Sequence, residues 1–206
     1  MKLYDYSKSS ASYRVRIALN LKGLAYQSQT VSLLDGDQRG DSYLALNPSG
    51  LVPALIDNGK VLTQSLAIIE YLEEAYPSPS ILPADPVTRA RCRAIALDIA
   101  CDIHPLNNLR VLKHLTGTMG HSEEEKLDWY LHWLRLGLAA VEKKVESSQT
   151  TFCCDEIPTL ADICLIPQLF NARRFSLDLT PYPTLKEIEQ RCQALSAFEQ
   201  AHPDNV

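Results

Sequence analysis

A chain of 206 residues with a formal net charge of −5, from 20 basic and 25 acidic residues, is long enough to fold around a core without disulfides or a metal. The acidic balance argues against a nucleic-acid partner, and no apolar stretch approaches the ~20 residues of a membrane span. The opening MKLYDY lacks the apolar run of a signal peptide, and the six cysteines form no C-x-x-C pair. We therefore expect reduced thiols and a cytoplasmic location.

The first part of the chain predicts a small α/β domain with a mixed sheet. Residues 2–6, 11–22 and 25–33 have the patterns of a strand, a helix and a strand. Two further strands follow in residues 51–64, joined at Asn58-Gly59, a pair that favours a tight hairpin turn. A helix then begins at Ser65, which we expect to be its N-cap. The order is βαβ followed by ββα, and the domain covers residues 1–79.

A proline-rich linker at residues 77–86 separates this domain from one that is helical throughout, residues 86–206. Helices are expected at residues 88–115, 123–145 and 184–197. Another helix follows Thr159, with Asp162 three positions later in a variant of the capping box.

Three short segments of the first domain have the chemistry of a ligand site. Ser9-Ser10 precedes a helix, where backbone N–H groups and the helix dipole favour an anion. Val52-Pro53 lies at the start of a short strand. The proline either marks that strand as an edge strand or forms a cis peptide bond that turns the preceding backbone toward a ligand. Gln64-Ser65 places an amide and a hydroxyl at the start of a second helix. These groups could bind a carboxylate, or Ser65 could be an ordinary N-cap with no ligand.

The motifs SSASYRVRIALNLKG, ALNPSGLVPAL, LTQSLAIIEYLEE, PLNNLRVL and PTLADICLIPQLFNARRF occur in this order along the chain. Together they resemble the glutathione transferases over the entire length, and more narrowly the zeta class, which includes maleylacetoacetate isomerase and maleylpyruvate isomerases. The resemblance implies the glutathione-transferase fold: an N-terminal thioredoxin-like domain with a mixed four-stranded sheet and a C-terminal helical bundle. It also implies a homodimer.

The resemblance implies glutathione as the cofactor. The carboxylate of its γ-glutamyl group would meet Gln64 and Ser65, its cysteine backbone would pair with Val52 before a cis Pro53, and Ser9 would stabilise its thiolate. Tyr4 and Tyr6 are rivals for that last role, since other classes use an N-terminal tyrosine. The implied glutathione-binding residues are Ser9, Ser10, Ala11, Val52, Pro53, Gln64, Ser65, His104 and Asn108, with Ser9 and Ser10 as the catalytic pair.

Ala11 departs from the family pattern, which commonly has cysteine at this position. An isomerase that uses glutathione's sulfur needs no protein nucleophile there, so we expect the alanine to be tolerated.

A substrate with two carboxylates requires local cations in this acidic chain. Lys8, Arg110 and Arg174 are the candidates, with Arg173 as the neighbouring rival of Arg174, and each is equally compatible with a solvated charge on a helix. Arg174 matches the family's substrate-binding arginine.

The resemblance thus implies a glutathione-dependent isomerase that converts maleylacetoacetate or maleylpyruvate to the fumaryl isomer in aromatic catabolism, and the sequence does not separate the two substrates. A conjugating or peroxide-reducing transferase and a non-catalytic binding module are the alternatives. No metal, nucleic-acid or membrane partner is expected.

Overall fold

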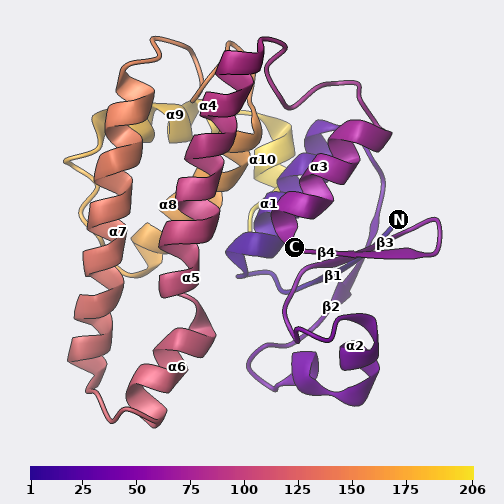
Figure 1. Ribbon diagram of the computed structural model, residues 1–206, viewed down its shortest axis with the longest axis vertical. Coiled ribbons are helices and arrows are strands. Elements are labelled where there is room, and N and C mark those ends of the chain that lie inside the picture. Colours follow the sequence, from indigo (N-terminus) through magenta and orange to yellow (C-terminus); the bar gives the residue numbers. More distant parts are fainter. The chain divides into compact units, whose positions relative to one another are not determined.

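The computed structural model describes residues 1–206 and divides into two compact units (Figure 1). The first unit contains Met1–Ile81 together with Gln193–Val206, and the second contains Leu82–Cys192. The sequence-based boundaries placed residues 86–206 in one domain. The structure instead groups the C-terminal residues with the first unit, because the last helix, α10 (Ser196–Ala201), packs on α1 (Ser10–Leu21).

The first unit is built on a four-stranded mixed sheet, as predicted. Its strands are β1 (Lys2–Asp5), β2 (Gln27–Thr30), β3 (Ala54–Asp57) and β4 (Lys60–Thr63), in the order β2-β1-β3-β4. β1 runs parallel to β2 and antiparallel to β3, and β3 is antiparallel to β4. The β3–β4 turn has Asn58 at φ 46° and Gly59 at φ 74°, so the Asn-Gly pair forms the predicted hairpin turn.

Helices α1 and α3 (Ser65–Ala75) supply many of the apolar side chains that are buried in this unit. Val15, Ile17 and Leu19 of α1 are fully buried, as are Ile68 and Leu72 of α3. The 3₁₀-helix η1 (Asp37–Arg39) and the short helix α2 (Asp41–Leu46) lie in the connection between β2 and β3.

The second unit is helical. Its elements are α4 (Pro86–Leu97), the π-helix η2 (Asp98–Ile103), α5 (His104–Leu106), α6 (Leu109–Gly117), α7 (Glu123–Glu146), α8 (Leu160–Arg174) and α9 (Pro183–Gln193). The single helix predicted at residues 88–115 is wrong, because the chain passes through the π-helix and a break at Asn107. Pro105 has no N–H to continue the α-helical ladder, and Asn108 begins a new helix as its N-cap.

The predicted capping box of α8 is confirmed. Asp162 is fully buried and accepts hydrogen bonds from the Thr159 N–H and hydroxyl, both at 2.8 Å, and from the Cys153 N–H at 2.9 Å. Three donors thus converge on one carboxylate, which fixes the loop before α8 to the start of that helix.

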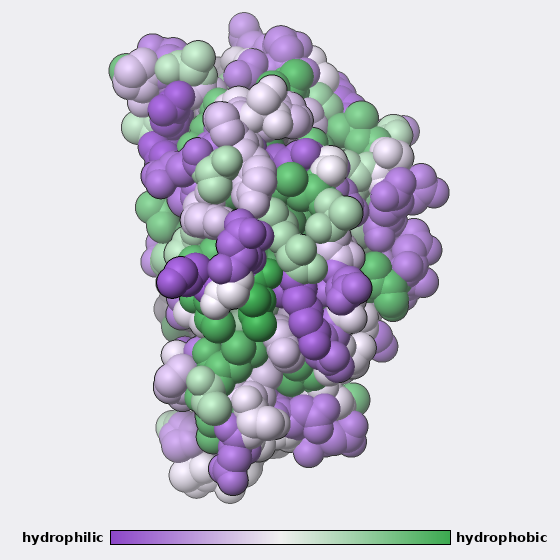
Figure 2. Space-filling model, turned by 90° about the vertical axis from the view of Figure 1, so that its right-hand side faces the viewer, coloured by the Kyte–Doolittle hydropathy of each residue, from purple (hydrophilic) through white to green (hydrophobic).

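The cysteines are all free thiols, and only Cys101 is exposed. On the face drawn in Figure 2, hydrophobic residues are interspersed with hydrophilic ones. None of the helices combines the length and hydropathy that a membrane span requires.

Candidate functional site

Ser9 stands at the start of α1 as its N-cap. Its backbone is extended (φ −77°, ψ 120°), and its Oγ accepts a hydrogen bond from the Ser12 N–H at 3.3 Å. The Ser9 N–H donates to the Tyr6 carbonyl at 2.9 Å, which closes a tight turn after β1. Because Oγ is the acceptor in the cap, the Ser9 hydroxyl hydrogen remains able to donate to an anion held at the helix start.

Ser10 and Ala11 occupy the first turn of α1, where backbone N–H groups have no acceptor within the helix and the dipole favours negative charge. Ser10 is 4% exposed and Ala11 is half-buried. Lys8, just before this turn, is exposed. Three of the predicted residues, Ser9, Ser10 and Ala11, are thus brought together by one helix terminus.

Tyr4 and Tyr6 have a different environment. Both pack against a buried cluster of Val31, Tyr43 and Val52, and the Tyr4 ring lies 6.0 Å from the ring of Tyr43. The two tyrosines therefore contribute to packing beside the sheet, whereas Ser9 is the hydroxyl at the helix start.

Val52 precedes a cis peptide bond to Pro53, the alternative that the resemblance implied. The β-ladder begins at Ala54, so the N–H and C=O of Val52 are not used by the sheet. The preceding Leu51 carbonyl accepts hydrogen bonds from the Tyr43 hydroxyl and from the Asn47 side chain, both at 2.7 Å. These two contacts fix the loop that presents Val52.

Gln64, and not Ser65, is the N-cap of α3, and Ser65 is the first helical residue. Gln64 has φ 69° and ψ 117°, a conformation that non-glycine residues rarely adopt and that is often found at ligand-binding positions. Ser65 is 6% exposed, and its Oγ accepts a hydrogen bond from Nη1 of Arg14 at 3.3 Å. An arginine of α1 thus supports the start of α3 from inside the unit.

Three predicted residues of the second unit, His104, Asn108 and Arg110, lie around the break between α5 and α6. His104 begins α5 directly after the π-helix and is half-buried. Asn107 is 8% exposed, and its side-chain N–H donates to the Tyr130 carbonyl at 3.1 Å. Asn108 caps α6 by accepting the Arg110 N–H at 3.1 Å, and Arg110 itself is exposed. Asn108 therefore has an observed structural role.

Arg173 and Arg174 end α8 with different partners. Arg173 forms a two-point ion pair with Glu189, whose side chain is 3% exposed. Arg174 is exposed, hydrogen-bonds to the Asn171 side chain at 3.2 Å and makes no ion pair. Its guanidinium lies 5.9 Å from the centre of the Phe170 ring. Of the two arginines, Arg174 is the one available to a carboxylate from outside the chain.

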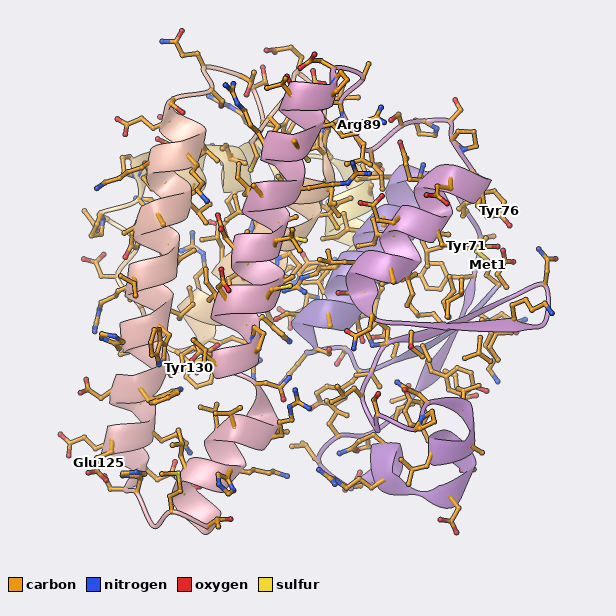
Figure 3. The ribbon with its side chains drawn as sticks, viewed as in Figure 1. Met1, Tyr71, Tyr76, Arg89, Glu125 and Tyr130 are labelled. Carbon is orange, nitrogen blue, oxygen red and sulfur yellow. The ribbon has the colours of Figure 1, made fainter.

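Tyr130 of α7, which is labelled in Figure 3, was missed by sequence reasoning. It lies close enough to Arg174 to feel its charge. It is 2% exposed, and its ring stacks on Phe175 with the centroids 3.7 Å apart. Burial raises the pKa of Tyr130 well above its usual value, and the positive charge of Arg174 opposes that rise. Tyr130 lies in a long helical segment and belongs to no motif, so the sequence around it does not mark it as a residue of the site.

Arg14 and Arg16 of α1 are buried, with exposed fractions of 2% and 0%. Two fully buried arginines in one helix were not predictable from spacing, although their presence in an otherwise small or apolar segment is a usable signal. No set of three or more His, Cys, Asp or Glu side chains is arranged to hold a metal ion.

Comparison with known proteins connects this geometry to a family. Residues 8–75 match the model of the glutathione S-transferase N-terminal domain. The maleylacetoacetate isomerase of Pseudomonas aeruginosa is 50% identical over 208 residues, which cover 100% of this chain and 97% of that protein.

Two solved structures agree with the fold over the full length. A holo maleylpyruvate isomerase, described as a bacterial glutathione transferase of the zeta class, superposes with a TM-score of 0.98 at 45% identity and covers 100% of this chain and 98% of its own. The maleylacetoacetate isomerase of Methylobacterium extorquens AM1, solved with malonate and glutathione bound, gives a TM-score of 0.97 at 40% identity with the same coverage. This chain therefore belongs to the zeta-class glutathione transferases, the family of the maleylacetoacetate and maleylpyruvate isomerases.

Proposed function

We propose that this chain is a glutathione-dependent cis–trans isomerase that converts maleylacetoacetate or maleylpyruvate to its fumaryl isomer. The observation that carries the proposal is the start of α1, where the Ser9 hydroxyl can donate from a capped helix terminus, in a chain half identical to a maleylacetoacetate isomerase over its whole length. One relative was solved with malonate and glutathione bound, which supports a protein that takes both glutathione and a small dicarboxylate.

The residues of the first unit fit glutathione, a peptide with an anionic end and a central thiol. The Val52 N–H and C=O lie outside the ladder and are suited to pair with a peptide backbone. The start of α3 offers unpaired N–H groups next to Gln64 and Ser65, which suit the γ-glutamyl carboxylate. Ser9 would hold the sulfur.

When bound, glutathione would supply a thiolate that adds reversibly to the cis double bond of the substrate. The former double bond is then a single bond, about which the substrate can rotate before the thiolate leaves. The task of Ser9 is to donate its hydroxyl hydrogen to that sulfur and keep it ionised. The N–H groups of the first turn of α1 add the positive end of a helix dipole. Ala11 contributes its backbone and no nucleophile, which is consistent with a sulfur that arrives with the cofactor.

Arg174 is the best candidate for holding a substrate carboxylate, because it combines exposure with a guanidinium that no acidic side chain occupies. Its planar fork suits two-point binding of a carboxylate. Lys8 and Arg110 are exposed cations that we propose as further contributors.

We also propose that the chain acts as a homodimer in the cytoplasm. Support comes from apolar side chains left exposed on the long helices of the second unit: Val87 at 59%, Leu97 at 47% and Leu136 at 59%. Light scattering behind a sizing column would distinguish a dimer from a monomer of 23.0 kDa.

The test of the function is an absorbance assay of freshly prepared maleylpyruvate and maleylacetoacetate with and without glutathione. Glutathione-dependent turnover of either substrate supports the proposal, and the ratio of kcat/KM values identifies the preferred one. Binding of glutathione without turnover of either would redirect the proposal to a conjugating transferase.

The proposed role of Arg174 in binding the substrate carboxylate is tested by Arg174→Gln, with Arg173→Gln as the matched control. Loss of a charged hydrogen-bond partner should raise the substrate KM about 10- to 100-fold in the Arg174 variant. The Arg173 variant loses its ion pair with Glu189 and should lose stability while keeping its KM. Equal KM values in both variants would remove Arg174 from the proposed site.

A further inference from the structure

The guanidinium of Arg16, in the middle of α1, makes four hydrogen bonds inside the first unit. The residue is fully buried. Nη1 donates to both carboxylate oxygens of Asp5 at 2.8 Å, and Nε donates to the Ala201 carbonyl at 3.0 Å. Nη2 donates to the Ser7 carbonyl at 2.8 Å. One side chain thus joins the end of β1, the loop before α1 and the end of α10.

The surroundings of Arg16 contain few other titratable groups. Its guanidinium carbon lies 5.2 Å from the centre of the Tyr13 ring. Burial raises the pKa of Tyr26, and the charges of Arg16 and Asp5 act on that hydroxyl in opposite directions. Asp5, Tyr13 and Tyr26 are therefore the ionisable groups that face the guanidinium, and the Asp5 carboxylate neutralises it.

Stability alone does not account for this ion pair. Desolvation of two charges offsets most of their attraction, so that apolar side chains of similar volume often stabilise a core equally well. An apolar side chain at position 16 would, however, leave the Ser7 carbonyl without its donor. The specific contribution of Arg16 is thus to fix the backbone at Ser7.

That backbone leads directly into the candidate active-site serine. Ser7 is two residues before Ser9, and the turn between them is closed by the hydrogen bond from the Ser9 N–H to the Tyr6 carbonyl. Within α1, the Ser12 N–H donates to Ser9 Oγ at 3.3 Å and the Tyr13 N–H donates to the Ser9 carbonyl at 2.9 Å, so the serine's orientation also depends on where the helix start lies. A shift of the Ser7 peptide would therefore move the Ser9 hydroxyl relative to the start of α1.

We infer that Arg16 is a positioning residue for the sulfur-activating serine: held by Asp5 and the Ala201 carbonyl, it fixes the Ser7 carbonyl and so aims the Ser9 hydroxyl at the glutathione sulfur. The inference rests on the proposed function. Arg16 touches neither glutathione nor substrate in this scheme, so it acts only through the loop at residues 7–9.

The test compares Arg16→Lys with Lys22→Met in the full chain. Arg16→Lys keeps a positive charge beside Asp5 and removes the guanidinium nitrogen, Nη2, that donates to the Ser7 carbonyl. Lys22→Met is the matched control, because Lys22 is another buried cation and lies at the opposite end of α1 from Ser9, as the C-cap. Its Nζ is bonded to Glu73 at 2.7 Å and to the Tyr76 and Pro79 carbonyls at 2.8 and 2.9 Å. For each variant we would measure thermal stability, glutathione affinity, kcat/KM, and the pKa of the bound thiol from thiolate absorbance.

The inference predicts that Arg16→Lys raises the pKa of the bound glutathione thiol by about one unit and lowers kcat/KM about tenfold, with glutathione affinity within about threefold. Lys22→Met should lower stability and leave the thiol pKa unchanged. An unchanged thiol pKa in Arg16→Lys, or an equal shift in both variants, would overturn the inference.

If Arg16→Lys does not fold, Asp5→Asn gives the same test, since it keeps the size of the side chain and weakens the contact that aims Arg16. A bound-thiol pKa in Asp5→Asn equal to that of the unaltered chain would also refute the positioning role. Failure of the unaltered chain to bind glutathione would instead refute the proposed function, and the positioning role with it. Glutathione binding and a thiol pKa shift without isomerase turnover would refute the reaction alone.

Discussion

Substitution of Ser9 by alanine removes two interactions at once. The hydroxyl oxygen accepts the Ser12 N–H as the cap of α1, and in the proposed mechanism the hydroxyl hydrogen is donated to the glutathione sulfur. The first loss affects the stability of the fold, and the second affects turnover, so the two effects are separable by measurement.

The structure sets the size of each effect. The cap contact is long, at 3.3 Å, which places its loss at the lower end of the usual range, about 0.5–1 kcal/mol. For a chain of this length that is a fall in Tm of about 1–4 °C. Removal of one preorganised donor to a developing anion costs on the order of 10²-fold in turnover. The catalytic loss should therefore greatly exceed the loss of folded protein.

The control is Asp85→Ala, which removes the N-cap of α4. Asp85 accepts the Thr88 N–H at 2.8 Å, a stronger cap than that of Ser9. Asp85→Ala should lower Tm at least as much as Ser9→Ala while kcat stays within about twofold, because α4 lies outside the proposed site. Ser9→Thr, which keeps a hydroxyl, should retain more turnover than Ser9→Ala. If Ser9→Ala keeps its turnover within a few-fold and the bound thiol keeps its pKa, Ser9 is not the sulfur's main donor.

Ala11→Cys should leave isomerase activity within a few-fold by the absorbance assay, and a large gain would contradict a mechanism in which only glutathione supplies the nucleophile. Asp162→Ala should cost about 3–5 kcal/mol of unfolding free energy in denaturant titration, because three buried donors lose their shared acceptor; a cost below about 1 kcal/mol would refute that reading. Burial alone would raise the pKa of Glu73, but hydrogen bonds from Lys22 and Ser80 outweigh it and lower the pKa below 4.5. The stabilisation by Glu73 is thus complete above about pH 4.5 and is lost as the pH falls through the folded-state pKa of its carboxyl group. Glu73→Gln should therefore be less stable at neutral pH, and its unfolding free energy should fall less steeply as the pH is lowered. Parallel curves of unfolding free energy against pH for the two proteins would count against the ion pair.

Local signals in the sequence were enough for much of the fold. Asn58-Gly59 formed its hairpin turn, and Thr159 with Asp162 formed the capping box, because both depend on residues that are close in the chain. The sheet followed from the order of short strands around one crossover helix. The glutathione-transferase family was likewise identifiable from motifs that each lie within one stretch of chain.

The errors arose where the decisive contact is distant or the backbone departs from a regular period. The hydrophobic pattern at residues 88–115 hid the π-helix and the break before α6, although Pro105 marked the site of the interruption. The C-terminal helix joins the first unit through contacts such as that between Arg16 and the Ala201 carbonyl, 185 positions apart in the chain. No spacing rule reveals such a contact. The ion pair between Arg173 and Glu189, a residue of another helix, is likewise invisible in the sequence.

The central claim is that glutathione is a recycled cofactor of an isomerisation, and it is tested most directly by proton NMR of the reaction with glutathione at a small fraction of the maleylpyruvate or maleylacetoacetate concentration. With glutathione as a recycled cofactor, the cis vinyl signals of one substrate should convert completely to those of the trans isomer, with many turnovers per glutathione and free glutathione undiminished at the end. Conversion that stops when the glutathione has been consumed, with a stable thioether as product, would contradict it.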